Sequence, residues 1–240
     1  MDLPGYVTLT RQGGLMREMQ VIANNLANLS TTGYRTEALV FSEMLQALPA
    51  EGDSVAMTAA RTRFTDERQG ALDRTDAPLD LAIEGAGFFQ IETAQGPRLT
   101  RAGAFLMDAT GQVVTAQGEA LLDLGGAPIQ LPPDAGSISV ASDGTLSVDG
   151  ALTAQIGLVQ PAPDAILTRE DGVRFAVEGA VEPAEDAGVV QGHLEASNVS
   201  PVTEIARMIA VQRAYEYGQS FLQAEHDRLR EAARTLIKPR

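Results

Sequence analysis

Both ends of this chain carry the apolar spacing of long amphipathic helices. Near the start, apolar side chains recur at alternating intervals of 4 and 3, at Leu15, Met19, Ile22, Leu26 and Leu29. Near the other end, the same intervals continue from Ile205 to Leu236. Side chains spaced in this way form one stripe on a helix, and a second helix must cover that stripe. The spacing therefore predicts helices over 5–29 and 201–236 that pack along their length.

The second predicted helix is long enough to need partners outside its own chain. At a rise of 1.5 Å per residue it extends about 54 Å, more than one short helix can cover. Pro201 suits its first turn, after Asn198 or Ser200 as the N-cap. Gln212 and Gln219 occupy stripe positions, where buried amides would fix register, although they could also be exposed. Such ends are typical of a subunit that assembles through its termini.

The middle of the chain is typical of a β-rich domain. Short apolar runs over 79–160 are separated by turn signals such as Asp143-Gly144 and Asp149-Gly150. The segment 36–57 is ambiguous, because its apolar residues up to Leu48 would also fit a helix. An extended, solvated arm is expected over 60–75. The fold class is therefore α+β, with two long terminal helices and a central antiparallel β-rich domain.

The charge distribution excludes several classes of partner. The net charge is −14, and residues 41–200 carry 24 acidic and 8 basic residues. Nucleic acid and anionic lipid both require Lys and Arg, so neither is expected as a partner. No apolar stretch approaches about 20 residues, and no secretory signal peptide is recognisable, so no membrane insertion is expected. The chain has no Cys, which excludes disulfides and thiolate metal sites.

No group of residues in the sequence points to catalysis. The two histidines are 33 residues apart, and no Ser lies in a G-x-S-x-G elbow. Gly85-Ala86-Gly87 is followed by a strand pattern rather than the helix that a dinucleotide loop requires. Three aspartates, Asp73, Asp76 and Asp80, lie close together in the sequence. Their spacing does not match that of a calcium-binding loop. We therefore expect no enzyme activity, no cofactor, no metal and no small-molecule substrate.

Four segments resemble, in order, the signatures of the bacterial flagellar rod and hook protein family. Residues 22–35, IANNLANLSTTGYR, are similar to the family's N-terminal signature, and residues 194–216 to its C-terminal one. Residues 81–89 and 100–105 resemble the middle signatures of rod and hook proteins. The length and the opening residues 6–9 are most similar to proximal rod members. Distal rod members and hook-type members remain alternatives.

The resemblance implies an architecture and a location. The terminal helices would pair as a coiled coil in an assembly domain formed by 1–35 and 200–240. An outer β-domain would comprise 79–188, joined through a connecting extended region at 36–78 and 189–199. The protein would be a structural subunit of the basal-body rod, which spans the periplasm. It would transmit torque from motor to hook, and the flagellar type III apparatus would export it without a cleaved signal peptide.

The resemblance also implies partners: copies of the chain itself, proximal and distal rod proteins, and the export apparatus. We predict that the helix–helix core consists of Leu15, Met19, Ile22, Leu26, Ile205, Met208, Tyr215 and Leu222. We predict that register between subunits is set by Asn24, Asn25, Asn28, Gln212 and Arg213. The ends of an isolated chain should then be poorly ordered, because their stripes lack partners.

Two hypotheses from other functional classes remain open at this point. The chain could be a secreted β-domain that binds a glycan or a peptide, with the helices as a stalk. It could also be a hydrolase that uses an acidic pair within 66–123. Removal of 201–240 separates these hypotheses from the first, because only rod assembly requires the last helix.

Overall fold

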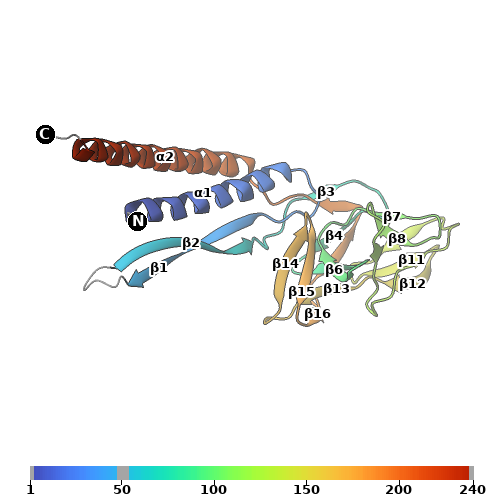
Figure 1. Cartoon of the computed structure of the whole chain (residues 1–240). Coiled ribbons are helices and arrows are strands. Elements are labelled where there is room, and N and C mark those ends of the chain that lie inside the picture. The colour runs from blue at the N-terminus through green and yellow to red at the C-terminus, as the bar shows by residue number, and fades with distance from the viewer. Residues whose placement is uncertain (1–2, 48–53, 238–240) are drawn as a thin grey trace. The chain divides into compact units, whose positions relative to one another are not determined.

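The computed structural model describes residues 3–47 and 54–237, and these form two compact units (Figure 1). Unit 1 comprises the described residues of 1–27, 36–66 and 199–240. Unit 2 comprises 28–35 and 67–198. The chain therefore enters unit 2 directly after its first helix, leaves it for a hairpin of unit 1, and returns.

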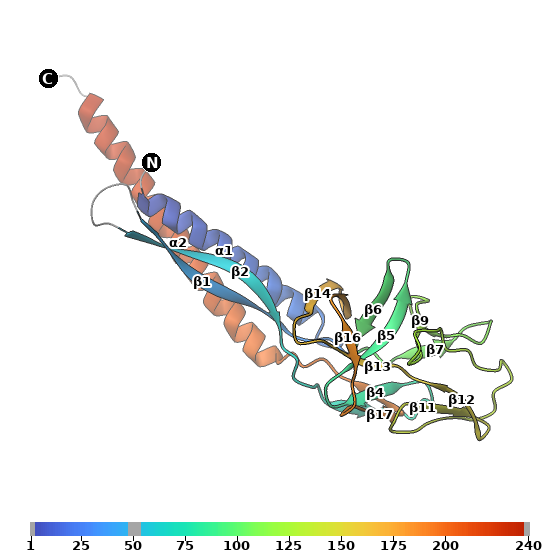
Figure 2. The same cartoon turned by 90° about the horizontal axis from the view of Figure 1, so that it is seen from below.

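Unit 1 contains two helices and one long hairpin. Helix α1 (Leu3–Ala27) and helix α2 (Pro201–Ile237) are the two helices that the terminal stripes predict. Strands β1 (Glu37–Ala47) and β2 (Ser54–Thr65) pair antiparallel, with a bulge between Val40 and Phe41. Both views place α1 beside α2 and beside the hairpin (Figure 1, Figure 2).

In the ambiguous segment 36–57, residues 37–47 form strand β1 of the hairpin and not a helix. Apolar residues in this run follow one another without a clear period of 2 or 3.6, so local pattern favours neither state. Pairing with β2 selects the strand. Residues 48–53 lie outside the described residues. The arm expected over 60–75 includes the end of β2 and all of β3 (Leu72–Arg74), and both are paired strands.

Unit 2 confirms the central antiparallel β-rich domain. Its first strands are β3, β4 (Leu81–Glu84), β5 (Phe88–Thr93), β6 (Gly96–Thr100), β7 (Phe105–Met107), β8 (Val113–Thr115) and β9 (Ala120–Leu121). They are followed by β10 (Ile138–Val140), β11 (Thr145–Val148), β12 (Ala151–Gln155), β13 (Leu158–Pro161), β14 (Ile166–Asp171), β15 (Arg174–Glu178), β16 (Val181–Pro183), β17 (Gly188–Gln191) and β18 (His193–Glu195). The hairpin signals at 143–144 and 149–150 fall between β10, β11 and β12 as predicted.

The largest sheet of unit 2 has nine strands, with β5 near its centre. Its order is β14-β15-β6-β5-β9-β8-β7, and β13 pairs with both β5 and β16. Smaller sheets join β10-β11-β12, β17-β4 and β18-β3. Strands β3 and β18 lie near the two ends of segment 67–198, so their pairing joins these ends.

The core of unit 2 is aliphatic, with a few aromatic rings. Phe89 and Phe105 are buried and meet edge to face, with ring centroids 5.3 Å apart. A second cluster forms around Phe175 with Leu99 and Val159. In β5 and β11 buried residues alternate with more exposed ones, so one face of each of these strands contributes to the core.

Candidate assembly surface

Helices α1 and α2 run antiparallel and meet along one stripe of each. The stripe of α2 that is buried or half-buried follows intervals of 4 and 3, at Glu204, Met208, Val211, Tyr215, Gly218, Leu222 and Glu225. Three of its members, Met208, Tyr215 and Leu222, belong to the stripe derived from the sequence. At the positions between these three, the buried residue is the one before the predicted residue: Glu204 is buried instead of Ile205, and Val211 instead of Gln212. Ile205 is accordingly 51% exposed, and Gln212 is exposed.

Polar contacts fix the register of the two helices. Arg207 Nε lies 3.1 Å from Glu18 Oε1, and Gln12 Nε2 donates to the carbonyl oxygen of Tyr215 at 3.4 Å. On α1, Ile22 is buried, and Leu15, Met19 and Leu26 are half-buried. These four residues were predicted from the sequence, and the structure places them together in unit 1.

Asn25 joins three elements of unit 1. Its side chain is fully buried; Nδ2 donates to the carbonyl oxygen of Glu37 at 2.8 Å and to Glu204 Oε2 at 3.1 Å. The backbone N–H of Glu37 donates to Asn25 Oδ1 at 3.0 Å. The amide therefore links the end of α1, the start of β1 and the first turn of α2.

The other residues predicted to set register lie in different surroundings. Asn24 is exposed on α1, and Arg213 is exposed on α2. Asn28 belongs to unit 2 and is half-buried, where Thr31 Oγ1 donates to its Oδ1 at 3.0 Å. On α2, Gln212 Nε2 donates to Glu216 Oε1 at 3.1 Å. The predicted set is thus divided between the two units.

A second apolar stripe covers the face of α2 that α1 does not contact. We call Val202, Ile205, Ala206 and Ile209 the outer stripe. These residues follow the spacing i, i+3, i+4 and i+7, which places them on one helix face. Val202 is 79% exposed and Ile209 is 46% exposed. On α1, the large apolar side chains of Leu9 and Met16 are also exposed. Exposed apolar stripes of this kind mark protein contacts.

A groove runs between the two helices farther along α2. We call it the helix groove; it has a volume of about 360 Å³ and is lined by Thr8, Arg11, Gln12 and Leu15 of α1 and by Ala214, Tyr217, Gly218 and Phe221 of α2. Gly218 sets the close approach of the helices, since a Cβ at this position would lie 3.1 Å from Gln12 Nε2. Tyr217 is 74% exposed and Phe221 is 48% exposed on the rim.

The family-like segment that follows α1 is built into unit 2, a placement that the sequence did not predict. Tyr34 and Arg35 are buried, and Gly33 adopts a φ of +69°. The N–H of Gly33 donates to the carbonyl oxygen of Glu195 at 2.7 Å, and the N–H of Asn198 donates to that of Tyr34 at 3.3 Å. The two ends of unit 2 are therefore hydrogen-bonded to each other.

A buried ion cluster completes this junction. Glu195 lies 2.9 Å from Arg35 Nη2 and 3.1 Å from Arg101 Nε, and all three side chains are buried. Arg101 also donates to the carbonyl oxygens of Gly85 and Gly87. Burial lowers the pKa of Arg101 to about 10, against the opposing effect of Glu195, so the group is still charged at neutral pH. No local spacing connects residues 35, 101 and 195, which explains why sequence patterns carry no signal for the cluster.

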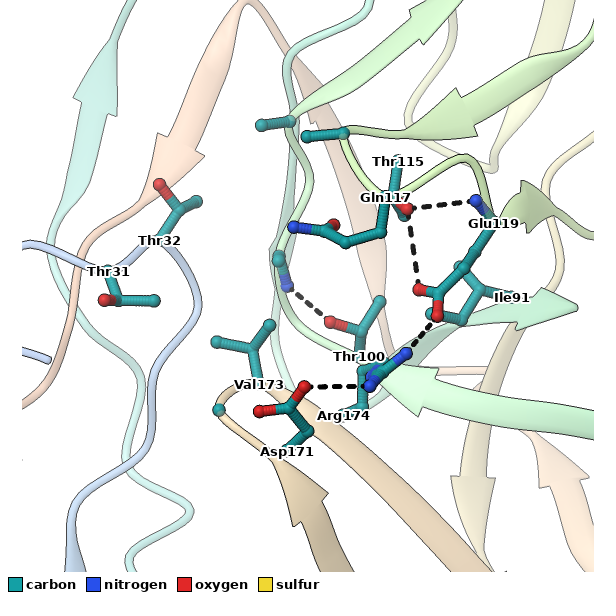
Figure 3. A pocket seen from close by; sticks show the side chains of 14 residues that line it. Thr31, Thr32, Ile91, Thr100, Thr115, Gln117, Glu119, Asp171, Val173 and Arg174 are labelled. Atoms are coloured by element: carbon teal, nitrogen blue, oxygen red, sulfur yellow. Dashed lines mark hydrogen bonds and ion pairs between the residues drawn. The ribbon is translucent and has the colours of Figure 1, made fainter. Parts of the chain in front are cut away.

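Unit 2 also carries a pocket of about 310 Å³ that is lined by several threonines (Figure 3). Arg174 bonds to Glu119 and, at 2.9 Å, to Asp171 on its wall. The charged side chains of the pocket are thus paired with one another. Across the described residues, no group of three or more His, Asp or Glu side chains could hold a metal ion. No helix in the described part of the chain is both long enough and apolar enough to cross a membrane.

Three families of known sequence match successive parts of the chain. The family described as "Flagella basal body rod protein" matches residues 10–35. "Flagellar hook protein FlgE/F/G D1 domain" matches residues 82–148, and "Flagellar basal body rod FlgEFG protein C-terminal" matches residues 190–235. These matches cover most of α1, much of unit 2 and most of α2.

Curated relatives are similar over almost the whole chain. The flagellar basal-body rod protein FlgF of Caulobacter vibrioides is 41% identical over 226 residues, which cover 90% of each chain. FlgF of Rhizobium meliloti is 35% identical over 96% of each chain. The rod protein FlgG of Bacillus subtilis is 30% identical over 94% of this chain and 96% of the relative.

Proposed function

This chain belongs to the flagellar basal-body rod proteins, and we propose that it assembles into the rod through the helices of unit 1. It is a structural subunit located in the rod of the basal body, with other rod components as partners. Its identity is 33–41% to the FlgF relatives and 30–32% to the FlgG relatives. We therefore infer a FlgF-like proximal rod subunit, with a FlgG-like distal subunit as the alternative.

The outer stripe of α2 is the observation that carries the proposed mode of assembly. Val202, Ile205 and Ile209 are large, apolar and exposed on the face opposite α1. Burial of one such side chain contributes about 1.5–3 kcal/mol, so a neighbouring helix would stabilise the assembled state. In the rod, α1 and α2 would act as part of a coiled coil whose lengthwise packing transmits torque.

The length of α2 supports the same proposal. Helix α2 has 37 residues and α1 has 25, a difference of about 18 Å at 1.5 Å per residue. Residues 226–234 of α2 are all exposed. Asn24, Gln212 and Arg213 are exposed on the two helices, where they would set register with neighbouring subunits. Export through the type III apparatus, inferred from the family, would bring each copy to the growing rod.

Complementation tests the proposal in a host whose own copy of the gene is deleted. We expect a full-length chain with Ile205→Asp and Ile209→Asp to be absent from purified basal bodies and to leave the cells non-motile. A charged carboxylate cannot be buried against a neighbouring helix without a large cost. The matched control is Ile166→Asp in unit 2, where Ile166 is 61% exposed.

Two further measurements make this test decisive. Thermal melting of the purified variants should match that of the wild-type chain, because the substituted side chains are exposed. A chain that ends at Ser200 should also be lost from basal bodies. Normal rod incorporation of the double variant or of the shortened chain would refute assembly through α2.

A further inference from the structure

We infer that Asp171 is a site of spontaneous modification, at which the main chain changes from an aspartyl to an isoaspartyl linkage. This modification is independent of the proposed function. The sequence contains three Asp-Gly pairs, at 143–144, 149–150 and 171–172, and each lies at the turn of a hairpin in unit 2. The dipeptide is the same at all three places, and the structure separates them.

The reaction needs no enzyme and no reagent besides water. The main-chain nitrogen of the glycine attacks the carbon of the protonated aspartate carboxyl group, a C–N bond forms, and one water molecule leaves. Water then opens the five-membered imide at either carbonyl carbon, which restores aspartate or leaves the chain linked through the side chain. Glycine favours the attack because it has no Cβ in the way. A reactive pair therefore combines a carboxyl group that can turn with a glycine whose backbone can adjust.

The pair at 143–144 lacks an adjustable glycine. Gly144 is buried, and its N–H donates to the carbonyl oxygen of Ala141 at 3.0 Å, so the attacking nitrogen is held in the turn. The carboxyl group is also engaged, because Asp143 Oδ1 accepts the N–H of Thr145 at 2.9 Å. This hydrogen bond lowers the pKa of Asp143 and makes the protonated form that cyclises rarer.

The pair at 149–150 lacks a carboxyl group that can turn. Asp149 Oδ1 accepts the N–H of Ser137 at 2.8 Å, and Oδ2 accepts the N–H of Gly136 at 3.2 Å. Cyclisation must break both bonds, and hydrogen bonds to a carboxylate are stronger than those between neutral groups. A Cβ added to Gly150 would contact nothing within 4 Å, so the glycine of this pair is open. The held carboxylate alone therefore protects the pair.

The pair at 171–172 meets both conditions. The side chain of Asp171 is 77% exposed, and in the described part of the chain its carboxylate accepts no main-chain N–H. It pairs at 2.9 Å with Arg174, which Glu119 also binds, so Arg174 keeps a partner when Asp171 turns away. Exposed ion pairs are weak because water screens them. Gly172 lies in the loop between β14 and β15, and a Cβ added there would contact nothing within 4 Å.

The modification changes one wall of the threonine-lined pocket, because Asp171, Gly172 and Arg174 all line it (Figure 3). An isoaspartyl linkage adds one methylene group to the main chain, so the turn between β14 and β15 becomes longer. We expect the pair of Asp171 with Arg174 to be lost and the bond of Arg174 to Glu119 to remain. The change is therefore local, and the pairing of β5 with β6 is kept.

Tryptic digestion of aged protein tests the site, because Arg169 and Arg174 place Asp171 in a short peptide of its own. Trypsin releases residues 170–174 as one peptide, whereas both other pairs lie in the peptide 102–169. The full-length chain would be held at neutral pH for several weeks, and a protein isoaspartyl methyltransferase with a labelled methyl donor would then mark the isoaspartyl groups. We expect severalfold more label in 170–174 than in 102–169. Equal or greater label in 102–169, or none in 170–174, would overturn the inference.

Two controls test whether the fold selects the site. In denaturant the three pairs should react at similar rates, so the label in 102–169 should become the larger because it contains two of them. A preference for 170–174 that persists in denaturant would contradict selection by the structure. Asp171→Glu should abolish the label in 170–174, because the longer side chain would have to close a six-membered imide. Asp164→Glu, at an exposed position of unit 2, should leave that label unchanged. Label that remains in Asp171→Glu would also overturn the inference.

Discussion

At the scale of single residues, buried polar side chains hold each unit together. In unit 2, one carboxylate, Glu195, pairs with both Arg35 and Arg101 at the junction of the first and last segments. Arg169 stacks on Tyr34 and Phe175 and donates to the carbonyl oxygen of Arg35 at 2.6 Å. The family-like residues Tyr34 and Arg35 therefore act inside the β-domain. Their buried contacts explain how a segment outside the strands is held in place.

Substitution of Glu195 by Gln should strongly destabilise unit 2. The amide has nearly the same shape but leaves two buried guanidinium groups without a negative charge, which costs about 3–5 kcal/mol. Urea unfolding at pH 7 measures the loss. Glu170→Gln is the matched control, since Glu170 makes an exposed bridge to Arg98 and should change the midpoint little. Similar midpoints for both variants would contradict the importance of the buried cluster.

Substitution of Asn25 by Ala should destabilise unit 1. It leaves the N–H and C=O groups of Glu37 without the partner that Asn25 supplies, at a cost of about 2–3 kcal/mol. Asn24→Ala, at the exposed neighbouring position, should have a much smaller effect. Circular dichroism at 222 nm during thermal melting follows the helices of unit 1. An equal loss in both variants would show that the three-way link through Asn25 is unimportant.

At the scale of elements, helix packing and turns depend on a few backbone positions. A Cβ added to Gly13 on α1 would have no atom within 4 Å, whereas Gly218 on α2 faces Gln12. Asp149, at the turn between β11 and β12, has a positive φ of 50°. Its carboxylate accepts the N–H groups of Ser137 at 2.8 Å and Gly136 at 3.2 Å. Gly13, Gly218 and Asp149 can each be tested by substitution.

The two helical glycines should respond differently to the same substitution. Gly13→Ala should raise the stability of the isolated chain by about 1 kcal/mol, because Ala favours a helix and no neighbour obstructs it. Gly218→Ala should gain less, since the new methyl group crowds Gln12 Nε2 at 3.1 Å. Urea unfolding of the two variants gives the comparison. A larger gain at Gly218 would contradict the close approach of α1 and α2.

Acid should remove the contribution of Asp149. The N–H groups of Ser137 and then Gly136 hold the pKa of Asp149 below its ordinary value. A carboxylate whose pKa is lower in the folded state stabilises the fold above the unfolded pKa, about 3.9, and loses this effect as pH falls through the folded pKa. We expect the wild-type chain to melt above Asp149→Asn at pH 7 and the difference to shrink by pH 2. A difference independent of pH would be inconsistent with this role.

At the scale of the whole molecule, the two units differ in how much of their apolar surface they cover by themselves. Unit 2 has its own core, and its two ends are hydrogen-bonded to each other, so we expect it to fold without a neighbour. Unit 1 covers one stripe of α2 and leaves the outer stripe and the last turns in solvent. The stability of unit 1 should therefore depend on assembly, whereas that of unit 2 should not.

Hydrogen exchange can measure this difference. In the purified chain, amides of residues 226–237 should exchange fast, because this part of α2 lies beyond the length of α1. Amides of β5 and β6 should exchange slowly. In assembled rods, residues 226–237 should become protected, with little change in β5. Strong protection of 226–237 in the free chain would show that its helix needs no partner.

The sequence alone determined both terminal helices, the antiparallel β-rich middle, its hairpin turns and the family. These depend on periodicity and turn chemistry, which act over a few residues. It also predicted the stripe positions Met208, Tyr215 and Leu222, which are half-buried on α2. It did not determine that the ambiguous segment forms β1, because the apolar residues of this segment show no clear period and its pairing with β2 is what selects the strand.

Only the tertiary structure decided which residues alternate with those three along α2. The spacing fits either Ile205 and Gln212 or Glu204 and Val211, and the contacts with Asn25, Glu18 and Gln12 of α1 select the second set. The same is true of the cluster of Arg35, Arg101 and Glu195. Its members are separated by 66 and 94 positions in the chain. Charged residues that meet only after folding have no characteristic spacing in the sequence, so local patterns cannot predict them.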